Sequence, residues 1–207
     1  MKATLHSVHD EAPNIRTFFF TPERHLRFVA GQFIELTLPH ANPDSRGVKR
    51  WFTISSAPGH ELVSITTKHA KEAPSTFKQT LWELSPGDEV DISEAMGDFV
   101  LPKDPAVPLV FVAGGIGITP FHAIVQWLRD THQKRAIQFI YSVHDEAELV
   151  FASTFTADFI QNITRIAQPN LTAKEINSLV GGIDGKQVFI SGPEPMTEAI
   201  VEQYGKL

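Results

Sequence analysis

The sequence predicts a small antiparallel β-barrel followed by a doubly wound, parallel-sheet α/β domain. Its first half contains short strand-like runs punctuated by glycine and proline, whereas its second half alternates apolar runs with helical stretches. Between the two halves, residues 102–108 contain three prolines. A chain of 207 residues is long enough for two compact domains of about 100 residues each. We place these domains at residues 1–103 and 104–207.

The first half has the alternation that is typical of barrel strands. In residues 31–38, apolar side chains alternate from Ile34 to Leu38, so they share one face of a strand. Further strands are expected at residues 50–55, 61–68 and 89–92. A short helix is expected over residues 74–84, with Ser75 near its first turn. Repeated short strands of this kind favour a small antiparallel barrel.

The second half has the pattern of a parallel sheet. Apolar strands are expected at residues 109–113, 137–143 and 188–191, with a helix at residues 120–130. Strands that alternate with helices favour a parallel sheet covered on both faces. The uncharged run at residues 107–128 has the length of a membrane span, but three glycines and Pro120 interrupt its middle. We therefore predict a strand, a glycine turn and a helix there, and no membrane span.

Composition narrows the function classes. Eighteen Lys and Arg against 24 Asp and Glu give a net charge of −6, which argues against a nucleic-acid partner. The chain has no cysteine, so disulfides, cysteine-ligated zinc and iron–sulfur clusters are excluded. The nine histidines show no metal-ligand spacing, and we predict no metal site. A cysteine-free chain whose first ten residues lack an apolar segment is expected in the cytoplasm.

The glycine turn is the first candidate binding motif. Gly115, Gly117, Thr119 and Pro120 lie where an apolar strand meets a helix. Glycines let a ligand approach the backbone, and the free N–H groups of a helix start favour a phosphate. Pro120 suits a first helical turn because its missing N–H would be unpaired there. The alternative is a tight strand–helix turn with no ligand.

Two further segments have candidate polar groups beside strands. Residues 50–53 offer a cation at Arg50, an aromatic ring at Phe52 and a hydroxyl at Thr53. Alternation puts Arg50 and Phe52 on one side of the strand and Thr53 on the other, so a barrel strand with an exposed arginine is the alternative. Ser191 follows the apolar run 188–190 and precedes Gly-Pro, which puts a hydroxyl at the carboxyl edge of the sheet. A plain strand end is the alternative there.

Together, in this order and spacing, these segments resemble the ferredoxin–NADP reductase superfamily of flavin oxidoreductases. The resemblance covers nearly the whole chain and also includes Gly31-Gln32-Phe33 and the terminal Gly-Pro-x-x-Met segment. It is nearest to small bacterial reductases and to the reductase modules of oxygenases. It implies a flavin on the barrel and a nicotinamide nucleotide on the α/β half.

The resemblance implies roles for particular residues of the barrel. Arg50 would bind a flavin phosphate, Phe52 would stack on the isoalloxazine, and Thr53, in place of the family's usual serine, would lie near flavin N5. Ser75 and Thr76 match the helix start that meets pyrophosphate. The other implied flavin-binding residues are Trp51, Thr66 and Lys68. Glu72-Ala73-Pro74 replaces the glycines often found before this helix, so FMN stays open beside FAD.

The resemblance also implies roles in the α/β half. Gly115, Gly117 and Thr119 would line the nicotinamide and pyrophosphate site, and Ser191 replaces a cysteine beside the hydride-transfer position. The remaining implied nucleotide-binding residues are Pro120, His144, Gly192 and Pro193. His144 takes the place of an arginine that contacts the adenosine portion, and Asp145 follows it. An acidic group there favours NADH over NADPH, with a solvated loop as the alternative.

The activity that the resemblance implies is transfer of hydride from NAD(P)H to bound flavin, then of electrons to a separate protein or small molecule. Thr53 and Ser191 would orient the reacting rings. Two alternatives remain open, a free-flavin or quinone reductase and a non-catalytic flavin-binding subunit. Members commonly continue with a last strand and an aromatic residue over the flavin, whereas this sequence ends at residue 207 and Tyr204 is expected in a helix.

Overall fold

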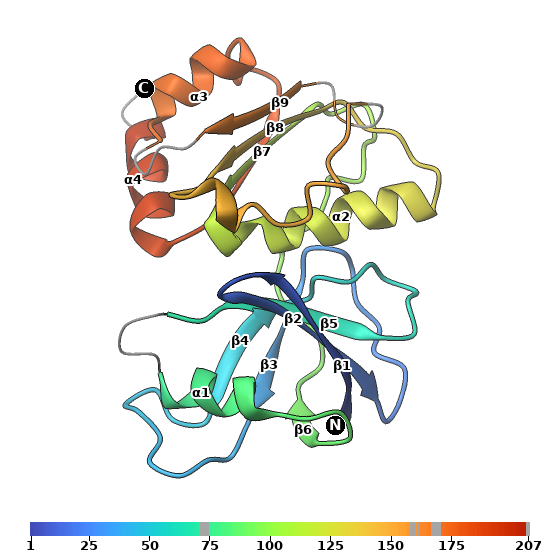
Figure 1. The fold of residues 1–207 in the computed structure, drawn as a ribbon. Helices are drawn as coiled ribbons and strands as arrows, with labels where there is room; N and C mark the ends of the chain where they lie inside the picture. Colours follow the sequence, from blue (N-terminus) through green and yellow to red (C-terminus); the bar gives the residue numbers. More distant parts are fainter. Residues whose placement is uncertain (71–74, 158–159, 161, 167–170, 206–207) are drawn as a thin grey trace. The chain divides into compact units, whose positions relative to one another are not determined.

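The computed structural model describes residues 1–70, 75–157, 160, 162–166 and 171–205. The chain divides into two compact units, residues 1–100 and 101–207, so this division falls three residues before the boundary placed on the sequence. Figure 1 shows the strands of the first unit and the layered helices and strands of the second. Each unit has its own core.

In its described residues, the first unit is a six-stranded antiparallel sheet with one helix. Its strands run in the order β4-β3-β6-β1-β2-β5. The elements are β1 (Lys2–Ala12), β2 (Ile15–Pro22), β3 (Phe33–Thr37), β4 (Lys49–Thr53), β5 (Val63–Lys68), α1 (Thr76–Glu83) and β6 (Glu89–Ile92). The ends of this sheet meet just after β4, where Ile54 bridges to Ile65 and the Ser55 N–H donates to the Ser64 carbonyl at 2.8 Å. The sheet is therefore closed into the predicted barrel.

The barrel core is built from the inward-facing residues of these strands. It includes Leu5, Phe18, Phe20, Ile34, Leu36, Ile54 and Ile65, all at most 1% exposed. Helix α1 adds Phe77 and Leu81 to the same cluster. This burial fixes the start of α1 against the inner face of β4, which matters for the candidate site.

The hairpin of β1 and β2 is absent from the strands expected on the sequence. In β1 only Ala3 and Leu5 are fully buried, and its pairing with β2 shifts register twice. A strand with so few buried positions and such shifts lacks a sustained period of two. Strand β9 (Asn162–Ile166) and helix α3 (Ala173–Val180) are likewise absent from the sequence-based expectation.

The second unit is a parallel sheet between helices, as predicted. The strands run β10-β7-β8-β9, all parallel. The remaining elements are β7 (Leu109–Gly114), a 3₁₀ turn (Gly115–Ile118), α2 (Thr119–Asp130), β8 (Ile137–Ser142), a 3₁₀ turn (Glu146–Glu148), β10 (Gln187–Ser191) and α4 (Glu194–Tyr204). Tyr204 is the last residue of α4, as expected.

Alternate residues of the sheet point to opposite faces and pack in two apolar layers. Phe111 stacks on Phe121 of α2, with ring centroids 4.7 Å apart. On the other face, Val110 and Val112 join residues of α3 and α4 in one cluster. Figure 1 shows α2 on one side of this sheet and α3 and α4 on the other. The carboxyl ends of parallel β7, β8 and β10 therefore share one edge, where ligands of α/β proteins bind.

Candidate functional site

Strand β4 keeps strict alternation, so its candidate residues lie on two faces. Phe52, 8% exposed, belongs to the barrel core, and the Arg50 side chain is 12% exposed. Trp51 is 71% exposed and lies on the outer face of β4. Thr53 lies on the same face as Trp51 and pairs with Phe33 of β3. The alternative of an exposed arginine is wrong. The separation of Arg50 and Phe52 from Thr53 is the one that the sequence pattern predicts.

Arg50 is held by an aromatic ring and a carboxylate. Its guanidinium carbon lies 5.0 Å from the centroid of the Phe77 ring. Its Nη2 donates to both carboxylate oxygens of Asp44, at 2.6 and 2.8 Å. Burial raises the pKa of Asp44, but the backbone N–H of Arg46 and the Arg50 guanidinium outweigh it, so this pKa lies below its usual value. A phosphate that binds Arg50 therefore meets a carboxylate already in place.

The start of α1 carries two hydroxyls that are engaged within the chain. Ser75 is the N-cap, and its Oγ accepts from the Lys78 N–H at 3.3 Å. The Thr76 hydroxyl lies 3.1 Å from His40 Nε2 and accepts from the Asp44 N–H at 3.3 Å. The structure thus brings Ser75 and Thr76 to the loop that holds Arg50. Glu72-Ala73-Pro74, which replaces the glycines common in the family, lies outside the described residues.

Lys78 is a basic residue of this site that the sequence analysis missed. Its Nζ donates to the backbone carbonyl of Lys68 at the end of β5. Burial, followed by the charges of Arg46, Arg50 and Lys68, lowers the pKa of Lys78 to about 8. Three other cationic side chains therefore lie close enough to Lys78 to act on its charge. We call Arg46, Arg50, Lys68 and Lys78 the basic cluster.

Thr66 lies apart from the basic cluster, in a network of buried hydroxyls. Its Oγ1 is 2.8 Å from that of Thr17 and 2.9 Å from Ser55 Oγ. Ser55 Oγ in turn lies 2.9 Å from Ser64 Oγ. A network of this kind satisfies buried polar groups and links β2 to β5. Thr66 thus has a structural role here beside the flavin-binding one that the resemblance implies.

In the second unit, the glycine turn lies against the end of β10. A Cβ on Gly117 would lie 2.3 Å from the Ser191 carbonyl oxygen, so only glycine fits there. Gly115 has a φ of +50°, and a Cβ there would meet nothing within 4 Å. Its backbone is therefore open on one side. This is the geometry that lets a ligand approach a main chain closely.

Thr119 and Pro120 support this turn from within. Thr119 is 5% exposed, and its hydroxyl donates to the Ile116 carbonyl at 3.3 Å. Pro120 is buried in the first turn of α2, as expected. Both residues thus hold the turn by packing and backbone contacts.

The Ser191-Gly192-Pro193 segment joins β10 to α4 at the same sheet edge. Ser191 pairs with Ala113 in register, and Pro193 is the N-cap of α4. Ser191 and Thr53 are both half-buried, and neither hydroxyl forms a hydrogen bond within the part of the chain that the structure describes. These two hydroxyls are free to meet a ligand.

His144 and Asp145 follow β8 and are exposed. The Asp145 carboxylate accepts from the Ala147 N–H at 2.9 Å and so caps the short turn Glu146–Glu148. One of its oxygens is therefore engaged, and the carboxylate as a whole brings negative charge to the carboxyl edge of the sheet. The structure brings both residues to the edge where Ser191 and the glycine turn lie.

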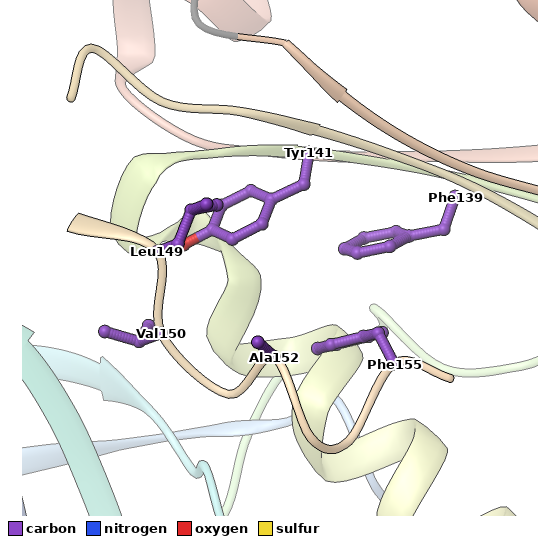
Figure 2. Close-up of a pocket in the computed structure, with 6 residues that line it drawn as sticks. All are labelled: Phe139, Tyr141, Leu149, Val150, Ala152 and Phe155. Atoms are coloured by element: carbon purple, nitrogen blue, oxygen red, sulfur yellow. The ribbon is translucent and has the colours of Figure 1, made fainter. Parts of the chain in front are cut away.

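A small pocket opens beside β8 (Figure 2). It is lined by Phe139, Tyr141, Leu149, Val150, Ala152 and Phe155. Its empty volume, part of which is open solvent, is about 190 Å³. Burial raises the pKa of Tyr141 to about 12, and the Val150 backbone near its hydroxyl falls short of hydrogen-bond geometry. The pocket is too small for a nucleotide.

The described residues hold no group of three or more His, Asp or Glu side chains that could bind a metal ion. Among the same residues, no helix is both long and apolar enough to cross a membrane.

Similar proteins give this site its context. A glycine betaine monooxygenase reductase subunit of Chromohalobacter salexigens is 30% identical over 150 residues, which cover 70% of this chain and 39% of that protein. NADH oxidoreductase HCR of Escherichia coli is 23% identical over 212 residues, which cover 98% of this chain and 63% of that protein. No family model matches the chain.

A solved structure of ferredoxin–NADP⁺ reductase from Plasmodium falciparum superposes on the whole chain and on 90% of its own, with a TM-score of 0.81 and 16% identity. The chain belongs to the ferredoxin–NADP reductase superfamily. The resemblance and the fold class expected on the sequence are thereby confirmed. This superfamily member spans only 39% and 63% of the two curated relatives' lengths.

Proposed function

We propose that this chain is an NAD(P)H-dependent flavin oxidoreductase that reduces a separate electron acceptor. Membership of the superfamily supports this proposal, as does similarity to a monooxygenase reductase subunit and to an NADH oxidoreductase. The acceptor would be a redox protein, such as an oxygenase component, or a small molecule. The cysteine-free chain fits a reducing compartment, so we also propose a cytoplasmic location.

The barrel residues fit a flavin, with FAD first and FMN as the alternative. Phosphate oxygens prefer charged donors, and the basic cluster supplies them at the start of α1. On the outer face of β4, the unengaged Thr53 hydroxyl would orient the ring system. When bound, the flavin supplies hydride acceptance and electron release. The task of the chain is to hold it, orient it and exclude water.

The observation that carries the proposal is the close approach of Gly117 to Ser191. A Cβ at residue 117 would lie 2.3 Å from the Ser191 oxygen, and the adjoining Gly115 backbone is open. A pyrophosphate needs such an accessible backbone beside a helix start. Ser191, at the end of β10, would then orient the nicotinamide ring through its free hydroxyl.

NADH is the nucleotide that the α/β half favours. The exposed Asp145 carboxylate at the end of β8 would accept from a ribose 2′-hydroxyl and repel a 2′-phosphate. We expect a higher kcat/KM for NADH than for NADPH. Steady-state oxidation of each nucleotide, with added FAD and an artificial one-electron acceptor, measures this ratio. The reductase proposal fails if the FAD-loaded protein oxidises neither nucleotide.

One observation favours flavin as a dissociable substrate instead. Phe52 is only 8% exposed and packs against Phe77, so its ring offers little open surface for stacking. Weak retention of flavin during gel filtration, together with saturation kinetics in free flavin, would support a free-flavin reductase. Tight retention at one flavin per chain would exclude it.

A further inference from the structure

Lys78 stands where a helix normally disfavours a cation. It is the third residue of α1, three residues after the N-cap Ser75, and the first turn contains no acidic residue. The positive end of the helix dipole acts on this turn, so a positive charge there is destabilising. An anion bound near the start of α1 would offset this unfavourable interaction.

The surroundings of Lys78 make its positive charge still less favourable. The ammonium donates to the Lys68 carbonyl but forms no ion pair among the residues that the structure describes. In the part of this region that the structure describes, the Asp44 carboxylate accepts from Arg50 through both oxygens and also lies 3.6 Å from Arg46. Partial burial and these neighbouring cations disfavour the charged form of Lys78. A half-buried charge without a counterion is costly unless a ligand supplies one.

We propose that Lys78 is a second anchor for the flavin's phosphate, beside Arg50. This inference rests on the proposed function. Lys78 and Arg50 reach the start of α1 from a helix and a strand, so a phosphate group of FMN or FAD would meet cations from two elements. Among the described residues, the Lys78 ammonium has no carboxylate partner, whereas the Arg50 guanidinium already has one. The two cations would therefore contribute unequally, with Lys78 gaining a counterion from the ligand.

Substitution of Lys78 then has two opposite effects. Lys78→Met removes a charge that has no ion-pair partner among the described residues, and it keeps an unbranched side chain, so the flavin-free protein should become more stable. The same substitution should weaken binding of phosphorylated flavins. If Lys78 has only a structural role, through its bond to the Lys68 carbonyl, Lys78→Met would instead lower the stability of the protein. It would then change the affinity for all three flavins equally.

The test is equilibrium binding of FMN, FAD and riboflavin to the full-length, flavin-free protein, followed by quenching of flavin fluorescence. Riboflavin has no phosphate and serves as the matched ligand. Lys49→Met is the matched variant, because Lys49 lies on the outer face of β4 and pairs with Glu35 at 2.8 Å. Lys78→Met should weaken FMN and FAD about tenfold and riboflavin less than about twofold. Lys49→Met should leave all three nearly unchanged.

A pH series adds a second readout. The affinity of the native protein for FMN should fall as pH rises from about 7 to about 9, because Lys78 loses its proton in this range. The phosphate stays dianionic there. Arg46, Arg50, Lys68, Asp44 and His40 also face this region, so the fall must be absent in Lys78→Met to be assigned to Lys78. Riboflavin should show no fall.

Three outcomes would overturn the inference. Unchanged FMN and FAD affinity in Lys78→Met would do so, as would an equal loss for riboflavin. Stabilisation of the native protein by inorganic phosphate, with FMN binding no tighter than riboflavin, would assign Lys78 to another anion. In all three cases flavin binding itself would persist. A native protein that binds no flavin would overturn the inference and the proposed function together.

Discussion

The Nη2 atom of Arg50 donates to both carboxylate oxygens of Asp44, at 2.6 and 2.8 Å. The Nη1 atom of the same guanidinium donates to the carbonyls of Arg46 and Gly47, at 3.0 and 2.9 Å. Arg50 is thus oriented by its own loop, with the Asp44 carboxylate standing where a phosphate is expected. Asp44 would therefore compete with the ligand for this arginine.

Asp44→Asn should tighten FMN and FAD binding about threefold to tenfold. The amide keeps the shape of the loop but removes the negative charge that repels a phosphate. Riboflavin affinity should not change, and fluorescence titration of the three flavins measures the difference. Weaker FMN binding would mean that Asp44 positions Arg50 instead of competing with the phosphate.

Lys78 should make the flavin-free protein more stable at alkaline pH. Its folded pKa of about 8 is below the unfolded value of about 10.4. Between these values the unfolded state holds a proton that the folded state lacks, so this site adds stability as pH rises, on the order of 3 kcal/mol in total. Urea unfolding at several pH values should show this rise in the native protein relative to Lys78→Met. Parallel curves for the two proteins would refute it.

Gly117→Ala should destabilise the α/β unit by about 2–3 kcal/mol, because the new Cβ would overlap the backbone of Ser191. Gly205→Ala is the control, since a Cβ there meets no atom closer than 3.6 Å. The control should stay within about 0.5 kcal/mol of the native protein. Urea unfolding measures the stability of both variants. Similar decreases in the free energy of unfolding would show that the close approach of Gly117 to Ser191 has no special effect.

Thr53→Val should slow reduction of the bound flavin by NADH about tenfold or more, because it removes a hydroxyl without changing the shape of the side chain. Thr53→Ser should retain most of the rate. Anaerobic stopped-flow absorbance in a single turnover separates this step from electron transfer to the acceptor. An unchanged rate in Thr53→Val would take Thr53 out of the mechanism.

The elements that the sequence predicts well are those that bury either alternate residues or a continuous apolar run. Alternation in β3 corresponds to a strand with one buried face, and the apolar runs of β7 and β8 correspond to strands that are buried on nearly every residue. The β1–β2 hairpin was missed because β1 buries few residues and is bulged. Such a strand is held by its neighbours in the sheet, and tertiary pairing is not visible in local periodicity.

In the candidate site, too, the sequence predicts the features that follow from local pattern and misses those that depend on the path of a loop. The opposite faces of Arg50 and Thr53 follow from alternation, and Ser75 behaves as the N-cap of α1. The pairing of Arg50 with Asp44 depends on the path of a loop and has no periodic signal. Lys78 did leave one signal, a cation three residues after a helix cap, where the helix dipole disfavours it.

The proposed reductase activity is tested most directly by the visible absorption spectrum of the FAD-loaded protein, recorded under anaerobic conditions during addition of NADH. The proposal predicts that the yellow colour of the bound flavin bleaches, and that it returns when an electron acceptor is added. A protein that binds FAD but keeps its colour with both NADH and NADPH would contradict the proposal and indicate a non-catalytic flavin-binding subunit.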